Sequence, residues 1–170
     1  MNLRRATPDD ALALAAVHVA AWQAAYRGIV PDSYLETFTI QSRSERFRQF
    51  LAGDSAETYA AERDGEIVGF LTIGSCRDSD LNPANTGEIW GIYLVPKHWR
   101  EGIGRYLCEQ GERMLASYGY STVALWVLAA NSRARGFYEA MGFKIDGACK
   151  DVQLGVTLKA VRYRISLSTI

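Results

Sequence analysis

The chain has 170 residues, 48% of them apolar and 22% charged, which is typical of one globular domain long enough to bury a core. Its 19 basic residues balance 19 acidic residues, so no net charge favours a nucleic acid or an anionic membrane as partner. The 3 cysteines are widely spaced without a CxxC pair and the 2 histidines lie far apart, so we expect no disulfide framework, no metal site and a reducing, cytoplasmic compartment.

A strand over residues 2–6 and a helix behind it open the predicted structure. The apolar stretch 11–22 has some likeness to a signal peptide, but it is short for a membrane span and His18 interrupts it. The preceding residues, Thr7-Pro8-Asp9-Asp10, offer an N-cap, a proline for the first helical position and two acids for the first turn. These start signals favour the N-terminal helix of a soluble domain over a signal peptide.

The next part of the chain predicts a loop, a helix and a hairpin. Residues 26–35 contain a glycine and a proline and predict a loop. The spaced apolar residues of 33–52 predict a second helix, which Gly53-Asp54-Ser55 closes. Arg63-Asp64-Gly65 lies between two strand-like runs and suits a tight turn with positive φ.

Strands and helices alternate in the second half. The predicted elements are a polar loop at 76–87, a strand at 88–95, a helix at 102–118, a strand at 121–128, a helix at 130–142 and two final strands at 143–149 and 157–167. The strand at 121–128 is apolar throughout, as expected of a central strand buried on both faces. The order β-α-α-β-β-β-α-β-α-β-β predicts one α/β domain over residues 1–170.

Two glycines, Gly102 and Gly104, stand where the strand at 88–95 gives way to a helix. Such a place usually holds an anion, because the first helical turn leaves N–H donors free and glycine lets a ligand approach the backbone. A P-loop would need GxxxxGK[ST], which does not occur. A dinucleotide fingerprint would need a third glycine where Leu107 stands and an acid near residues 122–124. The simplest alternative is a tight turn without a ligand.

The stretch IYLVPKHWREGIGRYL resembles the central motif of the GNAT superfamily of N-acetyltransferases, a strand, a proline and then Arg/Gln-x-x-Gly-x-Gly/Ala opening a helix. The later stretch NSRARGFYEAMGF, the terminal VRY strand and the element order match as well, so the resemblance covers nearly the whole chain. Trp99 departs from it, since it stands at the Arg/Gln position. The resemblance implies an α/β (α+β) domain with a mixed, mostly antiparallel central sheet flanked by helices and a parallel, splayed pair of strands after the Gly loop.

Acetyl-CoA as co-substrate, without a metal, is what the resemblance implies for the ligand. The backbone of residues 100–105 would cradle the pyrophosphate, the end of the preceding strand would pair with the pantetheine arm, and Asn131 would both cap its helix and touch the coenzyme. The coenzyme-binding residues implied in this way are Ile92, Tyr93, Leu94, Arg100, Glu101, Gly102, Ile103, Gly104, Arg105, Asn131 and Tyr138.

Tyr138 and Glu88 are the candidates for the chemistry. By the resemblance, a tyrosine seven residues after Asn131 points at the coenzyme sulfur and can protonate the leaving thiolate, and packing in the core is the alternative. Strand alternation predicts Glu88 on the face of Ile92, where it could accept the amine proton directly or through water, or could be a solvated strand end. We expect Cys108 in the core, so direct attack of the amine in a ternary complex is favoured over a covalent acetyl-cysteine.

The acceptor site of the family lies between the first two helices, their loop and the last strands, which here carry Trp22, Tyr26 and Tyr34. These rings could hold a cationic amine by cation–π contact or could form core under a loop. We therefore expect an N-acetyltransferase for the primary amine of a small molecule such as a polyamine or an amino acid, working as a monomer or homodimer. The alternatives are an acetyltransferase for protein N-termini or lysines and a sensor domain that binds acetyl-CoA without turnover.

Overall fold

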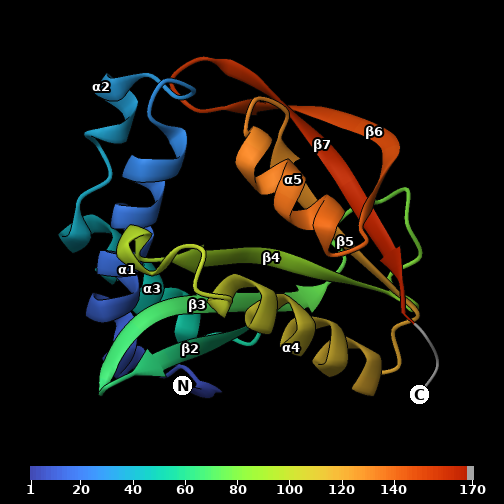
Figure 1. Cartoon of the computed structure of the whole chain (residues 1–170), viewed down its shortest axis with the longest axis horizontal. Coiled ribbons are helices and arrows are strands. Elements are labelled where there is room, and N and C mark those ends of the chain that lie inside the picture. The colour runs from blue at the N-terminus through green and yellow to red at the C-terminus, as the bar shows by residue number, and fades with distance from the viewer. Residues whose placement is uncertain (168–170) are drawn as a thin grey trace.

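The computed structural model describes residues 1–167 and contains a seven-stranded sheet flanked by helices (Figure 1). From one edge to the other the strands are β1 (Asn2–Arg5), β2 (Glu57–Arg63), β3 (Glu66–Ser75), β4 (Thr86–Leu94), β5 (Thr122–Leu128), β7 (Thr157–Ser166) and β6 (Lys144–Gln153). The helices are α1 (Ala11–Tyr26), α2 (Asp32–Leu35), α3 (Ile40–Leu51), α4 (Ile103–Ser117) and α5 (Ser132–Ala140). The predicted fold class is confirmed.

β4 and β5 form the parallel pair within the described sheet, and they soon part. Thr86–Glu88 pairs with Thr122–Ala124, and beyond this point β4 pairs with β3 alone and β5 with β7 alone. The two strands therefore run apart, which Figure 1 shows between the labels β4 and β5. Their facing edges carry backbone N–H and C=O groups without a strand partner. The predicted splayed pair is confirmed.

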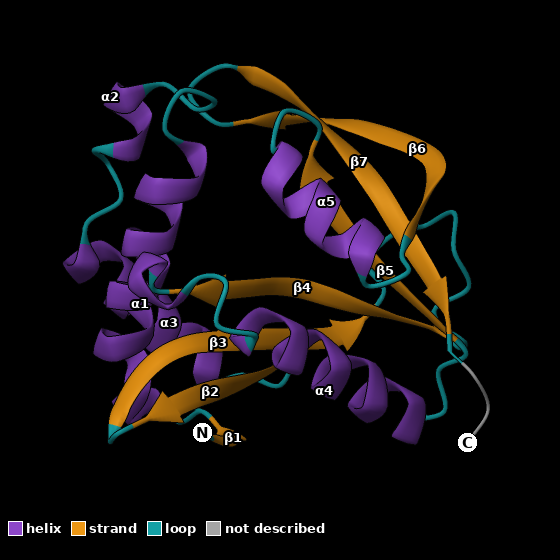
Figure 2. Ribbon diagram, in the orientation of Figure 1, coloured by secondary structure: helices purple, strands orange, loops and turns teal. Residues whose placement is uncertain are grey.

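The core is divided between the two faces of the sheet, because successive side chains of a strand point to opposite faces. On one face Leu71 of β3 packs with Leu107 and Leu115 of α4. On the other face Phe70 packs with Leu14 of α1, and α3 closes the same side. Figure 2 shows these helices flanking the sheet. The candidate site lies where β4 and β5 part, between α1 on one side and α4 and α5 on the other.

The hairpin turn was predicted correctly, whereas the second helix was not. Asp64 and Gly65 have φ of 53° and 82° and join β2 to β3. The predicted helix over 33–52 is two helices, α2 and α3. Thr39 separates them because its hydroxyl accepts the N–H of Ser42 at 3.1 Å and caps a new helix. The predicted loop over 26–35 accordingly ends in the short α2.

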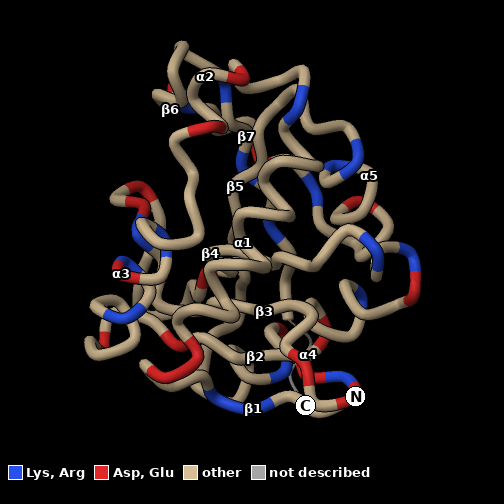
Figure 3. The backbone as a smooth tube through the Cα atoms, turned by 90° about the vertical axis from the view of Figure 1, so that its left-hand side faces the viewer, with Lys and Arg blue, Asp and Glu red and all other residues tan. Residues whose placement is uncertain are grey.

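The predicted start signals open a 3-10 turn, so Thr7 caps this turn, and α1 begins only at Ala11 with Asp10 at its N-cap. The Thr7 N–H donates to the Asp10 carboxylate at 2.8 Å, and a 3-10 turn over Pro8–Asp10 leads into α1. Arg4 binds the same carboxylate with two bonds of 2.8 Å, which ties β1 to the start of the helix. No helix within residues 1–167 is both long and apolar enough to cross a membrane. Basic and acidic segments are interspersed over the tube in Figure 3.

Candidate active site

A cavity of about 810 Å³ opens where β4 and β5 part. Ile92, Tyr93 and Leu94, the three residues predicted to meet the coenzyme arm, line it from β4. Leu125–Val127 line it from β5, and Tyr26 lines it from α1. The loop before α4 and the start of α5 complete the wall. Its volume lies within the range of small-molecule and cofactor sites.

The Gly loop presents a row of free backbone donors to this cavity. None of the N–H groups of residues 100–105 donates a hydrogen bond to any atom of residues 1–167. Arg100 and Gly102 have left-handed φ values of 66° and 84°, a geometry that turns neighbouring N–H groups toward a common point. A Cβ placed on Gly102 would meet nothing within 4 Å, so this side of the loop is open to a ligand. Free donors at a helix N-terminus suit a diphosphate.

Glu101, the acid within the loop, has its carboxylate engaged elsewhere. It accepts a bond from Arg63 Nη1 at 2.5 Å and lies 3.1 Å from His98 Nδ1. Together His98 and Arg63 lower the pKa of the Glu101 carboxyl. Arg100 and Arg105 line the cavity without such a partner among residues 1–167. The backbone N–H groups and the arginines of the loop therefore face the cavity, while Glu101 binds the β2–β3 hairpin through Arg63.

Trp99, the residue at the motif's Arg/Gln position, packs against the core. Its Nε1 donates to the carbonyl of Leu94 at 3.1 Å. Arg133, from the first turn of α5, places its Cζ 4.3 Å from the Trp99 ring centre and also lines the cavity. The Arg133 guanidinium thus lies beside Trp99, which stands where the motif usually has Arg or Gln. Arg133 could not be found from the sequence, because only the fold brings α5 next to this loop.

Helix α5 carries the other two predicted coenzyme residues. Asn131 is its N-cap, with the side-chain oxygen accepting the N–H of Ala134 at 3.2 Å, as predicted. Tyr138 is 9% exposed, lines the cavity and packs its ring against Phe137 and Phe143. Burial raises the pKa of the Tyr138 phenol well above its ordinary value, so the hydroxyl stays protonated at neutral pH. Tyr138 therefore packs in the core and lines the cavity at the same time.

Residues 21–143 match the model of the acetyltransferase (GNAT) family. The chain belongs to the GNAT family. It is 29% identical to the uncharacterized N-acetyltransferase YuaI of Bacillus subtilis (strain 168), over 91% of this chain and 92% of that protein. It is 30% identical to an uncharacterized N-acetyltransferase of Archaeoglobus fulgidus, over 85% of this chain and 93% of that protein. The PaiA N-acetyltransferase from Thermoplasma acidophilum, solved in complex with coenzyme A, is similar in fold, with a TM-score of 0.73 and 21% identity over 97% of this chain and 98% of that one.

The chain is thus an acetyl-CoA-dependent N-acetyltransferase, and the predicted family, enzyme class and co-substrate are confirmed. The free amides of the GNAT loop and the cavity volume fit this co-substrate. Cys108 is fully buried in α4, and burial raises the pKa of its thiol, which makes it a poor nucleophile. No group of three or more metal-ligating side chains occurs within residues 1–167.

A β-bulge at Trp90 corrects one prediction about the GNAT strand β4. The register against β3 skips this residue, pairing Thr72 with Gly91 and Ile73 with Ile89. Beyond the bulge the alternation is reversed, so Glu88 lies on the face of Tyr93 and Ile92 lies on the opposite one. The prediction that Glu88 shares a face with Ile92 is therefore wrong. A glycine inside a strand, here Gly91, is the sequence signal that could have indicated the bulge.

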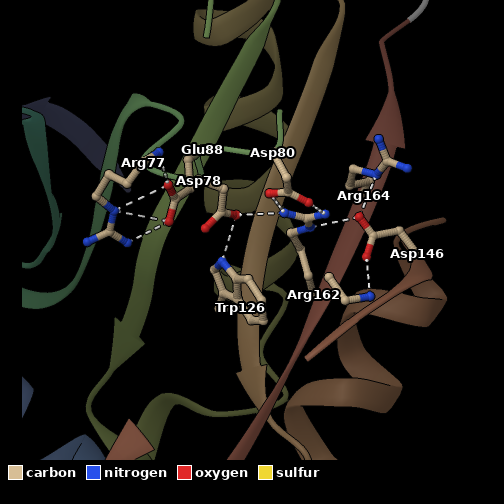
Figure 4. Close-up of polar contacts among 9 residues, drawn as sticks. Arg77, Asp78, Asp80, Glu88, Trp126, Asp146, Arg162 and Arg164 are labelled. Atoms are coloured by element: carbon tan, nitrogen blue, oxygen red, sulfur yellow. Dashed lines mark hydrogen bonds and ion pairs between the residues drawn. The ribbon is translucent and has the colours of Figure 1, made fainter. Parts of the chain in front are cut away.

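Glu88 is 1% exposed and bound by Arg77 (Figure 4). The carboxylate accepts the backbone N–H of Arg77 at 2.9 Å and its guanidinium Nη2 at 2.5 Å. The guanidinium lies on the Trp90 ring, with 3.9 Å from Cζ to the ring centre. Glu88 is not among the residues that line the 810 Å³ cavity or a smaller one of about 310 Å³ on the α1–α3 face of β4. Direct contact between this carboxylate and an amine in either cavity is therefore not part of the geometry.

A second ion cluster lies beside the β5 wall of the cavity (Figure 4). Arg162 of β7 is 4% exposed and binds Asp78, Asp80 and Asp146 at 3.1, 2.7 and 2.7 Å. Asp78 also accepts the indole N–H of Trp126 at 2.9 Å. The cluster joins the loop before β4 to β7 and fixes the Trp126 ring at the cavity wall.

The aromatic residues predicted for the acceptor site are only partly at a cavity. Tyr26 lines the larger cavity, and burial raises its pKa. Trp22 stacks on Phe38 with 4.3 Å between ring centres, and Tyr34 lies 5.6 Å from the same ring. Neither Trp22 nor Tyr34 lines the larger cavity or the smaller one. The smaller cavity, of about 310 Å³, lies nearby, on the face of β4 that carries α1 and α3.

Proposed function

We propose that this GNAT enzyme acetylates the primary amine of a small molecule by direct attack in a ternary complex. The observation that carries the proposal is one cavity that joins the free amides of residues 100–105 to the buried Tyr138. In this proposal the amides bind the pyrophosphate, residues 92–94 align the pantetheine arm as an added strand, and Asn131 contacts the same arm. Arg133 supplies the cation that Trp99 does not.

The reaction needs one bond made, one bond broken and one proton moved. The amine nitrogen bonds to the thioester carbonyl carbon, the carbon–sulfur bond breaks, the amine releases a proton and the departing thiolate takes one up. Tyr138 is the proposed donor to the sulfur, because its raised pKa keeps the hydroxyl protonated, and the proton that the amine releases goes to water and restores the phenol. Glu88 has a positioning role in this proposal, since it holds Arg77 rather than facing a cavity.

In this proposal the smaller cavity, next to the coenzyme cavity, receives the acceptor. Its volume of about 310 Å³ favours a small molecule over a protein segment. The spermidine N(1)-acetyltransferase of Thermoplasma acidophilum, 24% identical over 86% of this chain and 89% of that protein, is named for a small amine as well. Tyr138 at the coenzyme cavity favours turnover over sensing.

The test is free-thiol release from acetyl-CoA by the purified chain, across polyamines, amino acids, aminoglycosides and peptides with free N-termini. We expect amine-dependent release with one class of small amine, and heat of binding for coenzyme A in calorimetry. Faster turnover of peptides than of every small amine would support the protein acetyltransferase instead. Coenzyme binding without release would support the sensor.

A further inference from the structure

The smaller cavity is walled by cations without an acid. Arg43 and Arg46 line it from α3, and Arg77 lines it from the loop after β3. Its other lining residues within the described chain are His18, Thr72, Gly91 and aromatic side chains, so no Asp or Glu is among them. Guanidinium groups that converge on a partly desolvated space attract an anion, and their planar forks match carboxylate and phosphate oxygens.

Arg43 and Arg46 are available for such an anion. They are three residues apart on α3 and so lie on one face of the helix. Neither forms an ion pair with a carboxylate of residues 1–167, whereas Arg48 on the same helix pairs with Glu45 at 3.1 Å. The buried Nε of Arg43 has no hydrogen-bond partner within this part of the chain, and its Cζ lies 3.5 Å from the Phe38 ring centre. An unpaired buried donor is costly, and no carboxylate of residues 1–167 offsets the charge of Arg43.

Arg77 adds a third guanidinium in a fixed position. Glu88 takes its Nε and Nη2, and the Trp90 ring supports its flat face, which leaves Nη1 free of any bond to residues 1–167. Glu88 neutralises the charge of Arg77, but the charges of Arg43 and Arg46 remain unbalanced. His18 adds no further charge, because burial and then Arg43 lower its pKa to about 4 and leave the imidazole neutral. Its buried Nδ1 also lacks a partner within the described residues.

The two cavities meet at the bulge of β4. Trp90, Gly91 and Tyr93 line both of them. Gly91 leaves room for the Tyr93 ring, since a Cβ there would lie 2.5 Å from Tyr93 Cε2, and the bulge interrupts the ladder at this point. A molecule held in the smaller cavity would therefore lie next to the cavity assigned to the thioester, with Trp90 and Tyr93 between them.

We propose that the acceptor amine carries an oxyanion, a carboxylate or a phosphorus oxyacid, which Arg43, Arg46 and Arg77 bind. This inference rests on the proposed function and names its substrate class. The volume of about 310 Å³ suits a molecule the size of an amino acid. A polyamine is disfavoured here, because its ammonium groups would face guanidinium groups with no carboxylate lining the cavity.

Matched acceptors test the charge directly. We would measure kcat/KM for amino acids, for the same compounds as α-carboxamides, for aminomethylphosphonate and for spermidine. We expect the anionic acceptors to exceed the carboxamides by on the order of tenfold, although a carboxamide amine is the easier one to deprotonate. The phosphonate and carboxylate arms decide which oxyanion the cavity prefers.

Arginine variants locate the effect. Arg43→Gln and Arg46→Gln should each lower kcat/KM for the anionic acceptor by on the order of 10- to 100-fold, while carboxamide turnover and coenzyme A affinity stay within about twofold. Arg46 is exposed, so its variant should fold even if the Arg43 variant does not. Arg48→Gln, on the same helix but outside the cavity, is the matched control and should change nothing.

The inference and the proposed function fail in different ways. Thiol release that is as fast with carboxamides or spermidine, and insensitive to the Arg43 and Arg46 changes, would overturn the inference and leave the function intact. If no amine releases thiol, the proposed function fails. The inference would then be judged by titrating the same amino acids into the coenzyme A-loaded chain, where binding lost in Arg46→Gln would support it and absence of binding would overturn it.

Discussion

The Glu88 carboxylate is buried, and Arg77 holds it through both a backbone N–H at 2.9 Å and a guanidinium at 2.5 Å. The two partners differ in solvent contact, since the Arg77 side chain is 52% exposed and the Glu88 side chain 1% exposed. The pair therefore joins the interior of the sheet to the wall of the smaller cavity. It also predicts that the two residues respond unequally to substitution.

Arg77→Gln should destabilise the chain more than Glu88→Gln does. Removing Arg77 leaves a charge buried without its cation, which costs about 3 kcal/mol, whereas removing Glu88 frees a guanidinium that water already reaches and costs about 1 kcal/mol. Urea unfolding of both variants measures this difference. Both variants should also lower kcat/KM for the acceptor amine. In both, the fall in rate toward low pH should remain. Loss of that fall in Glu88→Gln alone would instead identify Glu88 as the proton acceptor.

Gly102 and Gly119 offer a matched pair for testing the Gly loop. Both have positive φ, 84° and 91°, and in both an added Cβ would meet nothing within 4 Å. Alanine at either position should cost about 1 kcal/mol in stability because of backbone strain alone. Only Gly102→Ala should weaken coenzyme A binding in calorimetry, by on the order of tenfold, because its Cβ stands among the free donors. Equal coenzyme affinity in the two variants would remove the loop from the binding site.

Arg133 is predicted to compensate for Trp99 in coenzyme binding. Arg133→Gln should weaken coenzyme A binding about fivefold and make the affinity less dependent on salt, because one cation near the anion is lost. Arg113→Gln is the control, since Arg113 lies on the exposed side of α4 and does not line the cavity. Titration calorimetry at two salt concentrations distinguishes a lost charge from a general loss of fold. An unchanged salt dependence in Arg133→Gln would contradict the assignment.

Local signals explain why much of the fold and the coenzyme loop could be predicted from the sequence. Asp64-Gly65 and the cap at Asn131 act on neighbouring residues, so spacing alone indicates them. The bulge at Trp90 and the stacking of Arg133 on Trp99 could not be predicted in this way. They depend on strand register and on helix docking, which bring together groups far apart in the chain. The arginines of the smaller cavity were missed for the same reason.

The Arg4–Asp10 pair predicts how stability depends on pH. Arg4 lowers the pKa of Asp10 from its ordinary 3.8 to about 2. A lowered folded-state pKa contributes stability that is complete above pH 3.8 and is lost as pH falls through 2. Asp10→Asn should therefore destabilise the chain by about 1 kcal/mol at pH 6, since water screens the partly exposed Arg4, and by almost nothing near pH 2. Thermal unfolding of both proteins across this range checks it, and a difference that does not shrink in acid would contradict the pairing.

Tyr138→Phe tests the proposed proton donor. The ring and its packing against Phe137 and Phe143 remain, so coenzyme A affinity should stay within about twofold of the parent value. Loss of the hydroxyl should lower kcat by about 10²- to 10⁴-fold, the usual contribution of a positioned acid. Tyr120→Phe, next to Gly87 and away from the cavity, controls for loss of a phenol as such.

The pH dependence of kcat adds an independent check on Tyr138. Burial raises the pKa of its phenol above the ordinary value near 10, so the parent enzyme should not lose kcat through phenol ionisation between pH 7 and about 10. A donor with an unshifted pKa would lose its proton, and with it the rate, toward the upper end of that range. A kcat that is independent of the hydroxyl in Tyr138→Phe would show that the thiolate leaves without its help.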